Sequence, residues 1–172
     1  ILNTYIHGDE IKFPNLNFKD DQLKNISRFI IQACGTSYYA GLIGKYLIED
    51  LARVPTEVDI SSEFRYRRML NSIDEIVVAL SQSGETADTL ACIREAKSKF
   101  FDILSFVNVK GSSIDRESDA VIYTHSGPEI GVASTKNYIA QKLNLYLFSL
   151  YLGKYRGTVS NDDYQVHLSN IA

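Results

Sequence analysis

Two short loops hold most of the side chains in this sequence that could recognise a ligand. The hydroxyl and amide groups are those of Thr36 and Ser37 beside Gly35, and of Ser81, Gln82, Ser83 and Thr86 around Gly84. Each loop comes where an apolar run ends and a helical pattern begins, and backbone N–H groups at a helix start favour an anion. Hydroxyls donate further hydrogen bonds without adding charge, and glycine lets a ligand approach the backbone closely. The two loops therefore predict a phosphate monoester as the ligand.

Helix capping is the alternative interpretation of the second loop, because serine and threonine often cap helices. One cap needs only one oxygen, whereas four polar side chains occur here within six positions, so phosphate binding is favoured. Glu85 stands in the same loop and would repel a phosphate, so we expect its carboxylate to point away. Neither loop has the P-loop pattern, and no GxGxxG follows the first predicted strand, so a dinucleotide is not expected.

A third candidate segment, residues 127–136, precedes the longest helical pattern. The backbone at Val132 and the hydroxyl of Ser134 could reach a sugar, and Ser134 or Thr135 could cap the helix. Lys136 could pair with a phosphate, although a solvated lysine is the more common outcome at such a position.

Other reactive side chains give weaker signals. Cys34 could act as a nucleophile, but no histidine lies near it in the sequence, so a small buried thiol is favoured. The three histidines, His7, His125 and His167, have no metal-ligand spacing, and we expect neither a metal nor a cofactor. The arginines of residues 62–67 could bind an anion, form surface ion pairs or contact another subunit.

Strand and helix patterns alternate along the chain from Arg28, and these elements would position the loops. The predicted strands are Phe29–Ile31, Val54–Ile60, Ile76–Leu80, Ile103–Val107 and Ala120–Tyr123, and the predicted helices are Ser37–Leu51, Ser61–Leu70, Thr86–Lys99 and Thr135–Tyr151. Several strands are continuous apolar runs, which indicates a parallel sheet buried between helix layers. Ligands of such sheets bind beyond the carboxyl ends of the strands, where both hydroxyl loops fall.

Composition limits the function classes. The chain has 172 residues, 45% of them hydrophobic, and a net charge of −3, which suits a soluble globular protein. It does not favour binding to nucleic acid or a membrane surface through bulk charge. The longest apolar stretch, Leu143–Leu152, is about half of the roughly 20 residues that span a bilayer. Two cysteines and no signal-peptide pattern predict a reduced, cytoplasmic setting.

Four segments carry a resemblance to a known family. They are residues 33–38 (ACGTSY), 62–67 (SEFRYR), 80–89 (LSQSGETADT) and 129–136 (EIGVASTK). In this order they resemble the first sugar isomerase (SIS) domain of the glutamine–fructose-6-phosphate aminotransferase family, from about Ile26 to Tyr151. The resemblance implies a three-layer αβα sandwich with a five-stranded parallel sheet, of flavodoxin-like type. We expect a lead-in segment at 1–25, the SIS domain at 26–153 and the start of a linker at 154–172.

The resemblance also implies a role for each loop. The phosphate of fructose 6-phosphate or glucosamine 6-phosphate would be held by Ser37, Ser81, Gln82, Ser83 and Thr86, and the sugar would be lined by Thr36, Val132 and Ser134. Glu129 would lie near the site and could assist.

The same resemblance implies that catalytic groups lie outside this chain. The family's proton-transfer base, Schiff-base lysine and ring-opening histidine belong to a second SIS domain and the C-terminal tail, and a separate domain carries the glutaminase. We therefore expect no catalytic residue here, an inactive binding piece, and a homodimeric parent enzyme. The alternative is a sugar-phosphate sensor or regulator, although nothing before Arg28 resembles a DNA-binding helical segment.

Overall fold

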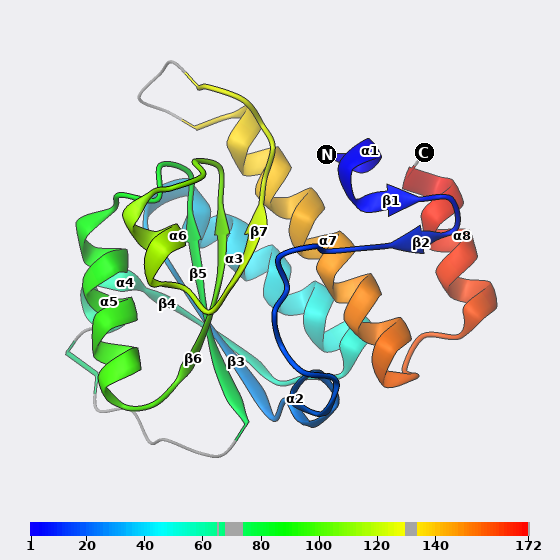
Figure 1. The fold of residues 1–172 in the computed structure, drawn as a ribbon, viewed down its shortest axis with the longest axis horizontal. Helices are drawn as coiled ribbons and strands as arrows, with labels where there is room; N and C mark the ends of the chain where they lie inside the picture. The colour runs from blue at the N-terminus through cyan, green and yellow to red at the C-terminus, as the bar shows by residue number, and fades with distance from the viewer. Residues whose placement is uncertain (65, 68–73, 130–133, 172) are drawn as a thin grey trace.

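A computed structural model describes residues 1–64, 66–67, 74–129 and 134–171 of the chain. Within these residues the centre of the molecule is a five-stranded parallel sheet in the order β4-β3-β5-β6-β7 (Figure 1). Its strands are β3 (Arg28–Ala33), β4 (Thr56–Ile60), β5 (Glu75–Ser81), β6 (Asp102–Val107) and β7 (Ala120–Tyr123).

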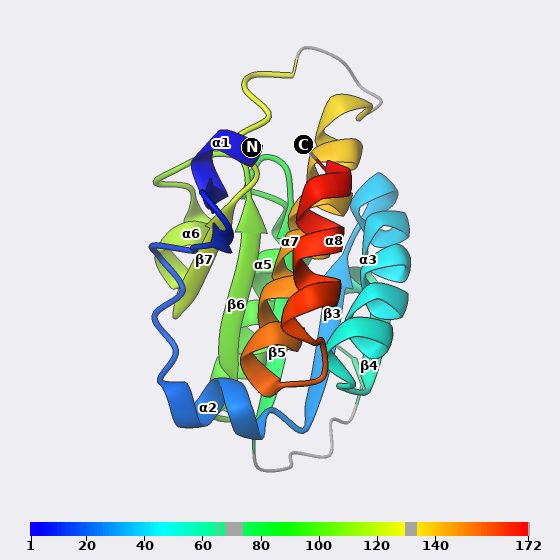
Figure 2. The ribbon, with the colours of Figure 1, turned by 90° about the vertical axis from the view of Figure 1, so that its right-hand side faces the viewer.

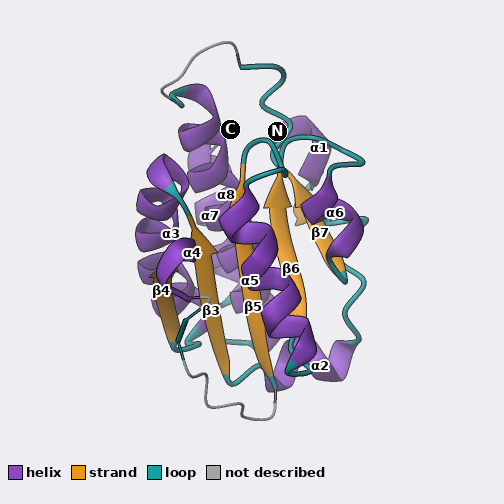
Figure 3. Cartoon of the chain, turned by 90° about the vertical axis from the view of Figure 1, so that its left-hand side faces the viewer, coloured by secondary structure: helices purple, strands orange, loops and turns teal. Residues whose placement is uncertain are grey.

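Helices cover both faces of this sheet. One face carries α3 (Gly35–Leu47), which continues as the π-helix η1 (Ile48–Ala52), and the long α7 (Lys136–Arg156) (Figure 2). The other face carries α4 (Ser61–Phe64), α5 (Ala87–Ser98) and α6 (Ser113–Glu117) (Figure 3). The predicted three-layer α/β sandwich with five parallel strands is confirmed.

The apolar strands supply two cores, one on each side of the sheet. Ile31 and Val78 pair across β3 and β5 and belong to the core beneath α3 and α7. Ile30 and Val77 form the preceding pair and belong to the core on the α5 side. All residues of β5 are buried, which is why this strand has no polar alternation.

Two glycines let α3 approach its neighbours closely. A Cβ at Gly41 would lie 3.0 Å from Cγ2 of Ile31, and one at Gly44 would lie 2.9 Å from Cδ1 of Leu145 in α7. Because real Cβ atoms rarely come this close to other atoms, larger residues would push α3 away from the sheet or from α7. The two glycines therefore let α3 pack closely on the sheet and on α7.

Both ends of the chain pack against this body. The N-terminal residues form α1 (Leu2–Tyr5) and a hairpin of β1 (Ile6–His7) and β2 (Glu10–Ile11), while α8 (Asn161–Ile171) returns along α7 beside the hairpin (Figure 1). The hairpin and α8 are joined by hydrogen bonds from Ile11 N–H to the Tyr164 hydroxyl (2.8 Å) and from Gln165 Nε2 to the Asp9 carbonyl (3.2 Å). The short α2 (Asp20–Asn25) contacts the end of α7.

The predicted elements differ from the structure mainly at their ends. The helix expected over Ser61–Leu70 is described only as α4, which ends at Phe64, and residues 68–70 lie outside the described residues. The helix predicted to end at Tyr151 is α7, which continues to Arg156. The polar segment that was expected to begin a linker contains α8, whose Tyr164 and Leu168 are buried. The segment boundaries at 25 and 153 stay a prediction.

Candidate functional site

The two hydroxyl loops lie at the same edge of the sheet. β3 and β5 are parallel neighbours, and Ala33 pairs with Leu80 at their carboxyl ends. The chain leaves β3 into α3 and leaves β5 into the loop of residues 82–86, so the two loops begin side by side (Figure 3). This is the edge at which open parallel sheets bind their ligands.

The first loop presents one exposed and one buried hydroxyl. Thr36 is exposed, whereas Ser37 in the first turn of α3 is buried. The Ser37 Oγ accepts a hydrogen bond of 2.9 Å from Nε2 of Gln141 in α7. Gly35 has φ of +57°, a conformation that suits glycine. Cys34 was expected to be a small buried thiol, but it is only partly buried, with its Sγ 4.0 Å from the Thr89 hydroxyl.

The second loop is folded around its own hydroxyls. Ser81 Oγ accepts the Gly84 N–H at 3.1 Å and lies 3.1 Å from the Thr86 hydroxyl. Ser83 Oγ accepts the Glu85 N–H at 3.2 Å. Gly84 has φ of +68°, and a Cβ there would fall 2.0 Å from the Ser112 Oγ, so any side chain at this position would collide with Ser112.

These contacts separate the two interpretations of the second loop. Thr86 occupies the N-cap position of α5, but among the described residues its side chain makes no capping hydrogen bond and instead faces Ser81. The hydroxyls of this loop are therefore not consumed in capping α5.

The hydroxyl oxygens of Ser37, Ser81 and Ser83 share one property. Each already accepts an N–H group from the protein. A serine hydroxyl has one hydrogen and two acceptor lone pairs, so accepting an N–H does not use the hydroxyl's own hydrogen. For Ser81, that hydrogen or the one of Thr86 lies in the bond between the two hydroxyls. The arrangement is suited to an acceptor-rich ligand such as a phosphate.

Glu85 is directed toward α6. Its Oε1 accepts the Ser113 N–H, the first of α6, at 2.7 Å, and hydrogen bonding from Ser113 lowers the Glu85 pKa. The carboxylate thus bonds to the start of α6. This agrees with the expectation that it points away from the second loop.

The third segment is organised by Glu129. Val132 lies outside the described residues, so its predicted contact with the sugar cannot be placed. The Glu129 carboxylate accepts hydrogen bonds from Ser134 Oγ (3.0 Å), Thr135 N–H (2.8 Å) and Lys136 N–H (3.1 Å). It also accepts from the Asn137 side chain. Hydrogen bonds from Asn137 first, and from Thr135, lower the Glu129 pKa to about 2.

Lys136 is bonded within its own segment. Its Nζ donates to the Pro128 carbonyl within the third segment. Arg67 is also committed, to Glu57 at 2.7 Å and to Asp59 at 2.5 Å, which favours the surface ion pair for this arginine. Arg65 and Arg68 lie outside the described residues.

Asn108, a residue that belongs to none of the predicted segments, joins the second loop to the third segment. Its N–H donates to the Gln82 carbonyl at 3.2 Å. Its Oδ1 accepts from both the N–H and the hydroxyl of Ser126 at 2.9 Å, and its Nδ2 donates to the Gly127 carbonyl at 2.8 Å. The available signal was a polar residue directly after Val107, where β6 ends.

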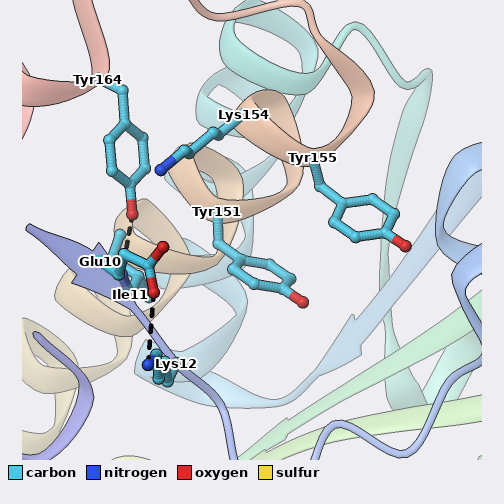
Figure 4. Close-up of a pocket in the computed structure, with 7 residues that line it drawn as sticks. All are labelled: Glu10, Ile11, Lys12, Tyr151, Lys154, Tyr155 and Tyr164. Atoms are coloured by element: carbon cyan, nitrogen blue, oxygen red, sulfur yellow. Dashed lines mark hydrogen bonds and ion pairs between the residues drawn. The ribbon is translucent and has the colours of Figure 1, made fainter. Parts of the chain in front are cut away.

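A hollow lies at the opposite end of α7, away from the two hydroxyl loops. It has a volume of about 380 Å³ and is lined by Glu10, Ile11, Lys12, Tyr151, Lys154, Tyr155 and Tyr164 (Figure 4). Both lysines have partners, since Lys12 pairs with Glu10 at 3.3 Å and Lys154 lies 4.2 Å from the centre of the Tyr164 ring. The hollow is where the hairpin and α8 meet the end of α7.

The part of the chain that the structure describes contains neither a metal-binding cluster nor a membrane-spanning helix. There, no group of three or more histidine, cysteine, aspartate or glutamate side chains could hold a metal ion. Nor does any of the described helices combine the length and apolar character needed to cross a bilayer. Both cysteines are free thiols.

Comparison with known proteins identifies the family of this arrangement. The SIS domain matches residues 22–151. A glutamine–fructose-6-phosphate aminotransferase of Clostridium tetani is 49% identical over 156 residues, which is 91% of this chain and 26% of the relative. One of Chlorobaculum tepidum is 51% identical over 152 residues, 88% of this chain and 25% of the relative. The chain thus spans about a quarter of the length of the curated relatives it matches.

A solved structure agrees with these sequence matches. The C-terminal domain of glucosamine-fructose-6-phosphate aminotransferase from Francisella tularensis superposes with a TM-score of 0.93 at 35% identity. The match covers 99% of this chain and 48% of that one, so α8 and the N-terminal hairpin have counterparts in it.

Proposed function

The chain belongs to the SIS domain family, and from this premise we propose that it is the sugar-phosphate-binding domain of a glutamine–fructose-6-phosphate aminotransferase. In this role it holds fructose 6-phosphate or glucosamine 6-phosphate at the carboxyl edge of its sheet. The aminotransferases that match this chain over most of its length support the choice of enzyme.

The hydrogen bonds that the serine hydroxyls of the site accept from the protein are the observation that supports this proposal most strongly. Ser37, Ser81 and Ser83 each accept a protein N–H. This leaves the hydroxyl hydrogens of Ser37 and Ser83 to donate, while Ser81 also shares a hydrogen bond with Thr86 in which either hydroxyl can be the donor. A phosphate monoester presents only acceptor oxygens when fully ionised, and charge-assisted hydrogen bonds are the stronger kind. The starts of α3 and α5 add partial positive charge at the same edge.

We assign the residues of the site as follows. Ser37, Ser81, Gln82, Ser83 and Thr86 bind the phosphate, and Thr36, Val132 and Ser134 line the sugar. Within the third segment, the hydrogen bond from Ser134 to the Glu129 carboxylate orients the Ser134 side chain.

We assign no catalytic residue to this chain. The overall reaction moves a proton between adjacent sugar carbons, which needs a positioned base with a pKa near the operating pH. Glu129 has a pKa of about 2 and accepts hydrogen bonds from four neighbouring residues, so it is poorly suited to this task. In the proposal, the base, the Schiff-base lysine and the glutaminase belong to the rest of a longer protein.

The longer protein would contain a second SIS domain and a glutaminase domain and would act as a cytoplasmic homodimer. What supports a longer protein is the coverage, because this chain accounts for about a quarter of its relatives. The two free thiols suit a reduced compartment.

Calorimetric titration tests the proposal. Glucosamine 6-phosphate should bind the 172-residue chain saturably. Unphosphorylated glucosamine should bind the same chain much more weakly or not at all, and glucosamine 6-phosphate should bind the Ser83→Ala variant much more weakly or not at all. Equal binding of glucosamine with and without its phosphate would contradict the assignment of the loops. Formation of glucosamine 6-phosphate from fructose 6-phosphate and ammonia by the chain alone would contradict its proposed lack of activity.

A further inference from the structure

Three buried amide side chains lie on one face of α7. Asn137, Gln141 and Asn144 are spaced by four and three residues, which places them on the same side of a helix. Each is at most 1% exposed, although the helix around them is packed into an apolar core. Burying an amide is costly unless it is hydrogen-bonded, so each one requires a partner.

The partners of these amides lie in segments at the carboxyl edge of the sheet or within α7. Asn137 donates to Glu129 in the third segment, and Asn144 donates to the carbonyls of Ala140 (2.8 Å) and Thr124 (3.4 Å). Gln141 differs from both, because its Nε2 donates to a side-chain hydroxyl, that of Ser37, at 2.9 Å. Of the three amides, only Gln141 bonds to a residue that we propose binds the phosphate.

This contact decides which way the Ser37 hydroxyl can donate. A hydroxyl whose oxygen accepts from Gln141 has its single hydrogen left for another acceptor. The surroundings restrict its direction, since Ser37 is 9% exposed and lies in the first turn of α3, a helix that packs against α7. Ser81 and Ser83 are oriented by main-chain N–H groups of their own loop, whereas Ser37 depends on a side chain from another helix.

We infer that Gln141 is a positioning residue that directs the Ser37 hydroxyl to donate to the ligand's phosphate. The inference rests on the proposed function and deepens it. Gln141 does not touch the ligand in this account; it acts only through Ser37. Replacing Gln141 therefore matters to binding only while Ser37 is present.

A double-mutant cycle on ligand affinity tests this dependence. The chains are the wild type, Gln141→Leu, Ser37→Ala and the double variant, each titrated with glucosamine 6-phosphate after thermal unfolding has shown that it is folded. Gln141→Leu should weaken binding several-fold, up to about tenfold, as expected for losing one oriented, charge-assisted hydrogen bond. In the Ser37→Ala background the same change should alter affinity by less than about twofold.

The competing account is that Gln141 only satisfies a buried hydrogen bond. In that case Gln141→Leu would lower stability but leave affinity unchanged, or would weaken binding equally in both backgrounds, and either result would overturn the inference. Failure of the wild type to bind would count against the proposed function instead. The free energies of unfolding of the same four chains would then test the contact itself. If the effects of Gln141→Leu and Ser37→Ala on stability were simply additive, Gln141 and Ser37 would not be hydrogen-bonded in solution, and the inference would fail.

Discussion

The carboxylate of Glu129 accepts the main-chain N–H of Thr135 at 2.8 Å and that of Lys136 at 3.1 Å. The start of α7 is therefore capped by an acid from six residues upstream. Ser134 and Thr135 were the expected caps, but Thr135, at the N-cap position, makes no side-chain capping bond within the described residues. Ser134 and Thr135 instead donate their hydroxyl hydrogens to Glu129. A negative charge is favourable at this end of a helix.

Replacing Glu129 by Gln should remove a stabilisation that depends on pH. The Glu129 pKa is about 2 in the folded chain against an ordinary value of 4.5. A carboxylate with a depressed pKa contributes its full stabilisation above the unfolded pKa and loses it as the pH falls through the folded pKa. The difference in free energy of unfolding between wild type and Glu129→Gln should thus be constant near neutral pH and shrink between about pH 4.5 and pH 2. Urea unfolding across this range measures it, and a difference that does not vary with pH would refute the assignment.

Gly84→Ala should damage both stability and binding. The φ of +68° is strained for alanine, and the new Cβ would fall 2.0 Å from the Ser112 Oγ. We expect a loss of more than about 2 kcal/mol in free energy of unfolding, because the collision adds to the backbone strain. Binding of glucosamine 6-phosphate should also be lost because the second loop must move.

Gly35→Ala is the matched control for the Gly84 change. Gly35 also has positive φ, +57°, but no described atom lies within 4 Å of the position of its Cβ. Only the backbone strain remains, so the cost should be about 1–2 kcal/mol and smaller than that of Gly84→Ala. Chemical unfolding of both variants compares them, and equal costs would show that the contact with Ser112 is unimportant.

Tyr164→Phe should weaken the contact between the N-terminal hairpin and α8. The Tyr164 hydroxyl is the acceptor for the buried Ile11 N–H at 2.8 Å, and an unsatisfied buried N–H costs about 1–3 kcal/mol. Tyr46→Phe on the exposed face of α3, where Tyr46 is 68% exposed, should change stability by less than about 0.5 kcal/mol. Thermal unfolding of the two variants measures the contrast, and similar melting temperatures would mean that the two chain ends are not held together by this bond.

The sheet could be predicted from sequence because its signal is local. Ile76–Leu80 is a continuous apolar run, and in the structure the whole of β5 is buried, as expected for a central parallel strand. By contrast α8 has two charged residues in its first turn and buries little besides Tyr164 and Leu168. Its helical pattern is correspondingly weak, and its stability depends on packing against a hairpin more than 140 positions away in the chain.

The polar loops could be located from sequence, but their contacts could not. The hydroxyls of residues 36–37 and 81–86 follow two strands whose adjacency comes from the sheet topology. That Glu129 would cap α7, or that Gln141 would bond to Ser37 across 104 positions, depends on how α3, α7 and the loops pack. Asn108 is a further case, because one asparagine after a strand carries no pattern of its own.

An NMR titration tests the central claim most directly. Amide signals of the ¹⁵N-labelled chain would be followed while glucosamine 6-phosphate is added. We predict saturable shifts concentrated at residues 35–37 and 82–86, with smaller shifts at the start of α7, and no shifts with unphosphorylated glucosamine. Shifts concentrated instead at Tyr151, Lys154 and Tyr164, around the hollow at the far end of α7, or no shifts at all from a folded chain, would contradict the claim.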